Sequence, residues 1–205
     1  RNLGFFSSFH YNSDMAKVNF KNCKFITSSL NLAGRPIDQK KEVVFLGKSN
    51  VGKSTLINSL VSQKIAFSSK KAGKTQLLNY FLIDNRFYLV DSPGYGYTSY
   101  GNKKDELFSQ MMETYFVNHP LLAGAVLLID SRRGIYEEEE NMIHYLLGLG
   151  IKLILIYTKC DTIGQKEMAL AKKEAEIFPS LAVFYSGKNA DFSSLRSLIV
   201  KTFSI

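Results

Sequence analysis

Short apolar runs alternate along this chain with segments in which apolar residues recur every three or four positions. The short runs have the length of buried strands, and the spaced segments have the period of helices that cover a sheet. Strands are predicted at residues 42–46, 78–83, 87–90, 123–129, 152–157 and 182–185. Helices are predicted at residues 53–61, 103–117, 137–149, 165–177 and 193–203.

This alternation predicts a three-layer α/β fold, in which a mostly parallel six-stranded sheet carries helices on both faces. Asp84-Asn85, between the second and third predicted strands, is a hairpin signal. One strand is therefore expected to run antiparallel at an edge of the sheet. Ligands of such folds bind beyond the carboxyl ends of the strands, so chemistry is expected in the loops that follow them.

The length of 205 residues and the 45% of apolar residues fit one domain with a sizeable core. That domain is assigned to residues 15–205, because Met15 is a plausible start. Residues 1–14 are aromatic and serine-rich without periodicity and are left unassigned. They fit an appended remnant, native sequence or the end of a targeting segment equally well.

The composition does not indicate a membrane protein or a disulfide scaffold. The longest apolar run, residues 121–129, falls short of the roughly 18 apolar residues of a membrane span. Cys23 and Cys160 are far apart and have no metal-ligand spacing, so free thiols in a reducing compartment are expected.

The net charge of +8 is unevenly distributed. Up to Tyr80 there are 13 Lys and Arg against three acids, whereas the rest of the chain carries 13 against 15. Such asymmetry suggests a polyanionic partner, with nucleic acid the leading candidate. A solvated basic surface that merely keeps the protein soluble would give the same count.

Residues 47–54 read GKSNVGKS, a full match to G-x-x-x-x-G-K-[ST] between a predicted strand and a predicted helix. Successive backbone N–H groups and the helix N-terminus of such a loop cradle phosphates. Lys53 would supply charge to the β- and γ-phosphates, and Ser54 a hydroxyl to magnesium. The predicted phosphate-binding residues are Gly47, Lys48, Ser49, Asn50, Val51, Gly52, Lys53 and Ser54. The loop alone does not select guanine, because kinases and ATPases share it.

Residues 158–161 read TKCD and resemble the [NT]-K-x-D motif of translation-factor-related GTPases. The carboxylate of Asp161 can accept hydrogen bonds from guanine N1–H and the 2-amino group, whereas adenine would leave it unpaired. The stem of Lys159 can lie over the base, and Thr158 keeps a polar tether where Asn is commoner. Cys160 completes the motif.

The segment after the last predicted strand, Tyr185, Ser186 and Gly187, occupies the place of the loop that backs the guanine. A backbone N–H there can reach the guanine O6, although Gly187 departs from the usual Ala or Ser.

Residues 91–94 read DSPG and match the D-x-x-G motif. Asp91 would reach magnesium through water, and the N–H of Gly94 would sense the γ-phosphate and release the following loop when it is lost. Ser92 and Pro93 lie between them. The alternative is a turn built on Pro-Gly.

A first switch is expected at Gly73, Lys74, Thr75, Gln76 and Leu77. Thr75 is the candidate for the second magnesium hydroxyl, bound only when γ-phosphate is present. The predicted metal ligands are thus Ser54, Thr75 and Asp91, and the predicted catalytic groups are Lys53, Thr75 and Gly94. A solvated loop is the alternative for the first switch.

Four strings together resemble the EngB (YihA/YsxC) family of bacterial ribosome-assembly GTPases, P-loop GTPases of the TrmE-Era-EngA-EngB type. They are GKSNVGKSTLINSL, AGKTQLLNYF, DSPGYGY and TKCD. The family has G-R-S-N-V-G-K-S-S, P-G-K-T-Q, D-x-P-G-Y-G and T-K-x-D. The resemblance runs from about Met15 to the last residue. Lys48 for Arg, Ala72 for Pro and the Ser-Gly loop depart from it, and loss of the proline is expected to loosen the first switch.

The resemblance implies a monomeric cytoplasmic GTPase that binds GTP and GDP with Mg²⁺ and acts in large-ribosomal-subunit maturation, cell division and septation. Ribosomal RNA is then the expected anionic partner, with Lys64, Lys70, Lys71 and Lys74 crowding the first switch. An ATP-using P-loop kinase is one alternative, which TKCD opposes. A nucleotide-gated scaffold with negligible turnover is another.

Hydrolysis is expected to be slow, because Tyr95 stands where many GTPases place a water-orienting Gln. Some relatives use potassium (K⁺) instead of an arginine finger, held partly by an Asn at the position of Asn50. Asn50 could equally cap the loop. In residues 130–133, which read DSRR, Arg132 or Arg133 could assist catalysis, touch RNA or lie solvated.

Overall fold

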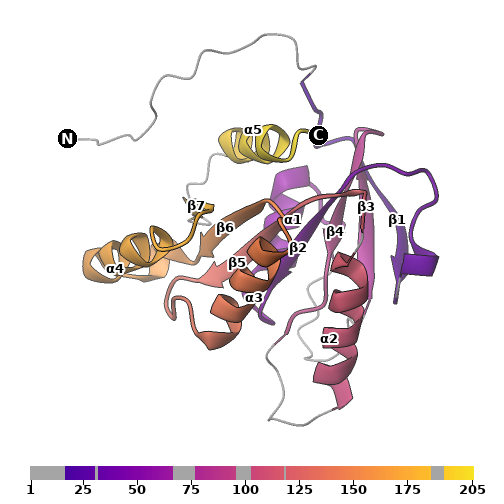
Figure 1. Cartoon of the computed structure of the whole chain (residues 1–205). Coiled ribbons are helices and arrows are strands. Elements are labelled where there is room, and N and C mark those ends of the chain that lie inside the picture. Colours follow the sequence, from indigo (N-terminus) through magenta and orange to yellow (C-terminus); the bar gives the residue numbers. More distant parts are fainter. Residues whose placement is uncertain (1–16, 31, 67–76, 96–102, 118, 186–191) are drawn as a thin grey trace.

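The computed structural model describes residues 17–30, 32–66, 77–95, 103–117, 119–185 and 192–205. In this part of the chain, a seven-stranded sheet forms the middle layer (Figure 1). Its strands, in spatial order, are β1 (Cys23–Ser29), β3 (Leu78–Ile83), β4 (Phe87–Asp91), β2 (Glu42–Gly47), β5 (Leu122–Asp130), β6 (Leu153–Thr158) and β7 (Leu181–Phe184). β3 pairs antiparallel with both of its neighbours, and the remaining pairs are parallel.

Helices cover both faces of this sheet (Figure 1). On one face, α1 (Lys53–Val61) and α5 (Phe192–Phe203) pack side chains such as Leu56, Ile57 and Ile199 against the strands. On the other face, α2 (Lys103–Phe116), α3 (Glu137–Gly148) and α4 (Gln165–Ala175) form a second core. Among the described residues, no helix is both long and apolar enough to cross a membrane.

The predicted fold class is confirmed, but the sheet contains one strand more than the six expected. The additional strand, β1, lies at the edge, so the antiparallel strand β3 is second from the edge. Lys24, Phe25 and Ile26 are exposed in succession, because a register shift between Phe25 and Thr27 breaks the alternation of the strand. An edge strand with a bulge therefore carries no period that a sequence pattern reveals.

The predicted hairpin turn is confirmed. Asp84 and Asn85 both adopt left-handed conformations, with φ of 49° and 55°, and the N–H of Arg86 donates to the carbonyl of Ile83. The carboxylate of Asp84 also accepts the backbone N–H of Asn19 at 2.9 Å. The hairpin thereby anchors the segment that leads into β1.

The parallel strands β4, β2, β5 and β6 end at the same edge of the sheet. Their register pairs Phe45 with Asp91, Gly47 with Leu128, and Asp130 with Thr158. Because parallel strands share their direction, the loops that follow them converge at this edge. These loops contain the predicted chemistry.

Candidate functional site

The loop between β2 and α1 has a backbone that only glycine adopts readily at two positions. Gly47 has a φ of 151°, and a Cβ there would lie 2.8 Å from Cγ1 of Val51. Gly52, the N-cap of α1, has a φ of 110° and faces open space. It has no side chain to cap the first turn, so the helix N-terminus is available to an anionic ligand.

The two predicted magnesium ligands that the structure describes are in contact. The hydroxyl of Ser54 donates to Oδ2 of Asp91 at 3.0 Å. Oδ1 of Asp91 is buried and has no hydrogen-bond partner. A buried carboxylate oxygen without a partner beside a hydroxyl is a set of hard oxygen donors, so these residues fit a magnesium ion.

Lys53 lies buried beside this pair, with 8% of its surface exposed. Burial raises the pKa of Asp91, and the charge of Lys53 and the Ser54 hydrogen bond oppose that rise. Burial likewise lowers the pKa of Lys53, against the attraction of Asp91. The site therefore gathers charged groups whose burial must be balanced by partners, which is typical of functional positions.

The D-x-x-G segment lies directly against the phosphate loop. A Cβ on Gly94 would approach the backbone nitrogen of Ser49 to 2.8 Å, so only glycine fits there. The N–H of Ser49 donates to the carbonyl of Tyr95 at 3.1 Å, and Lys48 and Tyr95 form an isolated parallel bridge. The hydroxyl of the buried Ser92 donates to the carbonyl of Phe45 at 2.7 Å. Pro93 and the side chain of Tyr95 are also buried.

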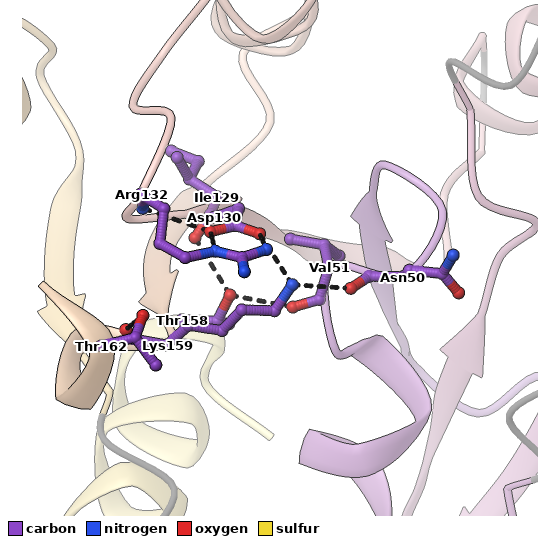
Figure 2. Close-up of polar contacts among 8 residues, drawn as sticks. All are labelled: Asn50, Val51, Ile129, Asp130, Arg132, Thr158, Lys159 and Thr162. Atoms are coloured by element: carbon purple, nitrogen blue, oxygen red, sulfur yellow. Dashed lines mark hydrogen bonds and ion pairs between the residues drawn. The ribbon is translucent and has the colours of Figure 1, made fainter.

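The T-K-x-D segment also contacts the phosphate loop through hydrogen bonds (Figure 2). The hydroxyl of Thr158 donates to the carbonyl of Val51 at 2.8 Å. The ammonium of Lys159 donates to the carbonyl of Asn50 at 3.0 Å. These two contacts bring the predicted base-reading segment and the phosphate loop into one site.

Asp161 lies in a short 3-10 turn, Cys160–Thr162, with its side chain exposed. The N–H of the buried Cys160 donates to the carbonyl of Tyr185 at 3.3 Å, and the thiol donates to the carbonyl of Tyr157. The carboxylate is therefore presented to solvent from an anchored backbone.

Several predicted site residues lie outside the described residues. They are Gly73, Lys74, Thr75, Gln76, Ser186 and Gly187. Their flanking residues are described: Leu77 is half-buried before β3, and Tyr185 is buried after β7. The first-switch assignment, with Thr75 as metal ligand and catalytic group, and the loop behind the guanine remain predictions.

The side chain of Lys48 turns away from the phosphate loop toward α3. Its ammonium pairs with Glu138 at 2.7 Å and with Glu139 at 3.2 Å. Partial burial opposes the shift, but hydrogen bonds to these two carboxylates raise the pKa of Lys48. Glu138 and Glu139 belong to the acidic first turn of α3, where negative charge is also favoured by the helix dipole. The sequence did not show that Lys48 pairs with this turn.

The sequence did not predict the contact between Asp130 and Lys159. Oδ2 of Asp130 lies 2.7 Å from the ammonium of Lys159 and 2.6 Å from a guanidinium nitrogen of Arg132 (Figure 2). The only sequence signal was the position of residues 130–133 after a strand at the same edge. Burial opposes the shift, but hydrogen bonds from Arg132 and Lys159 lower the pKa of Asp130.

Residues 42–159 match the family of 50S ribosome-binding GTPases. A crystal structure of a probable GTP-binding protein EngB has a TM-score of 0.63 over 80% of this chain and 98% of that chain, at 23% identity, which shows the fold alone. A structure of Era with MgGDPNP and part of 16S ribosomal RNA has a TM-score of 0.61 and 28% identity, over 79% of this chain and 56% of that chain.

Among curated proteins, the probable GTP-binding protein EngB of Clostridium beijerinckii is 39% identical over 87% of this chain and 90% of its own length. That of Halothermothrix orenii is 37% identical over 85% and 91%. These matches decide against the alternative of an ATP-using kinase. The chain belongs to the EngB family of GTP-binding proteins, within the 50S ribosome-binding GTPases.

Proposed function

We propose that this chain is a slow, magnesium-dependent GTPase switch that acts in assembly of the large ribosomal subunit. The observation that carries the proposal is the junction of three motif loops at one sheet edge. Lys159 and Thr158 bind the carbonyls of the phosphate loop, and Gly94 lies against Ser49 on its other side. The segments proposed to bind guanine, to bind the phosphates and to sense the γ-phosphate are thus in direct contact with one another.

In this proposal Asp161 selects guanine, Lys53 neutralises the β- and γ-phosphates, and Ser54, Asp91 and Thr75 hold magnesium. When bound, magnesium would neutralise charge that develops on the phosphates. The remaining predicted binding residues of the phosphate loop, of the first switch, of the D-x-x-G segment and of the guanine-backing loop act through backbone groups that line the ligand. Gly94 reports the γ-phosphate through its N–H.

Slow turnover follows from Tyr95, which replaces the water-orienting Gln. Its ring is 9% exposed, and its carbonyl is engaged by the N–H of Ser49. Burial raises the pKa of the Tyr95 hydroxyl, so the side chain stays protonated and cannot act as a general base toward water. Faster hydrolysis then depends on potassium near Asn50 or on a group supplied by the partner.

The proposed partner is the large ribosomal subunit in the cytoplasm, with ribosomal RNA as the contact and the chain acting as a monomer. The family description and the excess of positive charge before Tyr80 both support it. Lys64 is exposed beside the predicted first switch, so nucleotide-dependent RNA contact is proposed there. Effects on division and septation then follow from subunit assembly.

Sedimentation with purified large subunits tests the switch. The chain should cosediment more strongly with a non-hydrolysable GTP analogue than with GDP, and binding should weaken steeply as salt rises. Ser54→Ala, which loses the predicted magnesium hydroxyl, serves as the control and should bind equally with either nucleotide. Equal binding of both nucleotide forms of the wild type at several salt concentrations would reject the switch.

Depletion of the chain in its host, followed by gradient profiling, tests the role in assembly. Immature large subunits should accumulate, and re-expression of the wild type should remove them. Normal subunit profiles together with septation defects would instead favour a scaffold in division. The position of Tyr95 favours that second candidate, and multiple-turnover GTPase assays with and without subunits separate the two.

A further inference from the structure

Asp130 stands at the carboxyl end of β5, between the phosphate loop and the base-reading segment. Its carboxylate accepts hydrogen bonds from two positively charged side chains (Figure 2). Arg132 donates from Nε to Oδ1 at 2.9 Å and from a terminal nitrogen to Oδ2 at 2.6 Å, a bidentate geometry. Lys159 donates to Oδ2 at 2.7 Å. The carboxylate is 13% exposed, so these contacts form in a partly desolvated setting.

Lys159 needs this partner for a physical reason. Its backbone adopts a left-handed conformation with a φ of 59°, and its flexible side chain is 30% exposed. Such a side chain loses considerable rotamer entropy when it is held in one position. The carbonyl of Asn50 offers one neutral acceptor, whereas Asp130 adds a charge-assisted bond.

We propose that Asp130, itself held by Arg132, is a positioning residue for guanine-nucleotide binding that orients Lys159 across the junction of the base-reading segment and the phosphate loop. This rests on the proposed role of Lys159 beside the base. It assigns Arg132 a task in nucleotide affinity rather than in RNA contact or catalysis. Arg133 does not share it, because its guanidinium lies 5.7 Å from the ring centroid of Tyr136.

Equilibrium binding and dissociation of a fluorescent GDP analogue test the proposal. Asp130→Asn should weaken GDP binding about tenfold, mainly through faster dissociation, because it removes a charge-assisted hydrogen bond from Lys159. Arg132→Ala should weaken it about threefold, since Asp130 keeps its charge but loses its support. The matched control Arg133→Ala should stay within about twofold of the wild type.

A double-mutant cycle with Lys159→Ala separates positioning from general stability. If Asp130 acts through Lys159, adding Asp130→Asn to Lys159→Ala should change GDP affinity by less than about twofold. Fully additive losses, or an unchanged GDP affinity in Asp130→Asn alone, would overturn the proposal. Arg132→Ala, whose side chain is 51% exposed, gives the same cycle if Asp130→Asn does not fold.

GDP binding by the wild type distinguishes a failure of the proposed function from a failure of the positioning role. If the wild type did not bind GDP, the proposed function itself would be wrong. If it bound GDP and both Asp130→Asn and Arg132→Ala bound GDP as tightly as the wild type, only the positioning role would be rejected. Losses in Asp130→Asn and Arg132→Ala that disappear in the Lys159→Ala background support the proposal.

Discussion

At the scale of residues, the exposed carboxylate of Asp161 depends on hydrogen bonds that hold the neighbouring backbone in place. Asp161 faces solvent, while the neighbouring Cys160 is buried and bonded to the carbonyl of Tyr185. The thiol is inert in this setting, because burial raises the pKa of Cys160 and disfavours the thiolate. The Asp161 carboxylate is thus accessible to a ligand, while the backbone next to it is held by the hydrogen bond of Cys160.

Asp161→Asn should change the base preference from guanine to xanthine. In the proposed base site the carboxylate accepts hydrogen bonds from guanine N1–H and the 2-amino group, whereas an amide N–H can donate to the carbonyl that xanthine carries at that carbon. A loss of GDP affinity on the order of 100-fold, with a gain for XDP, is expected in competition binding. Asp130→Asn is the matched control, because it should weaken GDP without favouring XDP. Unchanged preference in Asp161→Asn would remove Asp161 from the base site.

At the scale of elements, Lys48 couples the phosphate loop to the N-terminus of α3. Glu139 is 4% exposed and also accepts the N–H of Tyr136 at 3.1 Å, within the capping box of the helix. The backbone of Lys48 bridges Tyr95 at the same time. The D-x-x-G segment with the adjacent Tyr95, the phosphate loop and α3 are therefore joined at one residue.

Lys48→Ala should destabilise the fold by about 1–3 kcal/mol, because it leaves a buried carboxylate oxygen of Glu139 without its cation. Lys48→Arg keeps the cation, so its denaturant midpoint should be close to that of the wild type. Glu140→Gln is a control in the same helical turn, since Glu140 is exposed and faces His144 instead. Equal midpoints for Lys48→Ala and the wild type would show that the pair contributes nothing.

Helix α5 approaches the sheet closely at Gly124. A Cβ there would lie 2.1 Å from the ring of Phe203, which is 2% exposed, and 2.8 Å from the carbonyl oxygen of Lys152. Gly124→Ala should therefore cost about 1–3 kcal/mol in chemical denaturation, because neither the packed ring nor the backbone can move aside cheaply. Gly148→Ala in α3 meets nothing within 4 Å and should be neutral or slightly stabilising. Equal losses in both variants would contradict this account.

At the scale of the whole molecule, charge affects the stability of the fold. The chain carries +8 overall, and acidification adds further positive charge. Hydrogen bonds from Asn19 and Asn22 lower the pKa of Asp84, and those from Arg132 and Lys159 lower that of Asp130 despite its burial. These carboxylates bind fewer protons in the folded state than in the unfolded state.

Stability should consequently fall as the pH drops below about 4, the ordinary aspartate pKa. A lowered folded pKa contributes stability above the unfolded value, and that contribution is lost as the pH falls toward the folded value. The denaturant midpoint of Asp130→Asn should lie below that of the wild type at pH 6 and converge on it in acid. Parallel curves for the two proteins from pH 6 to pH 2.5 would show that Asp130 does not contribute.

Short stretches of sequence were enough to predict the loop between β2 and α1, the bounds of α1 and β3, and the turn at Asp84-Asn85. Each depends on neighbouring residues: a glycine conformation, a helical period or a left-handed turn. Only the tertiary structure revealed the bulged edge strand β1, whose exposed residues lack a period. It also decided that Asp130 pairs with Lys159, 29 residues away, and that Lys48 reaches Glu138 and Glu139. A charged residue at a loop or helix end has many possible partners, and the packing of strands and helices selects one.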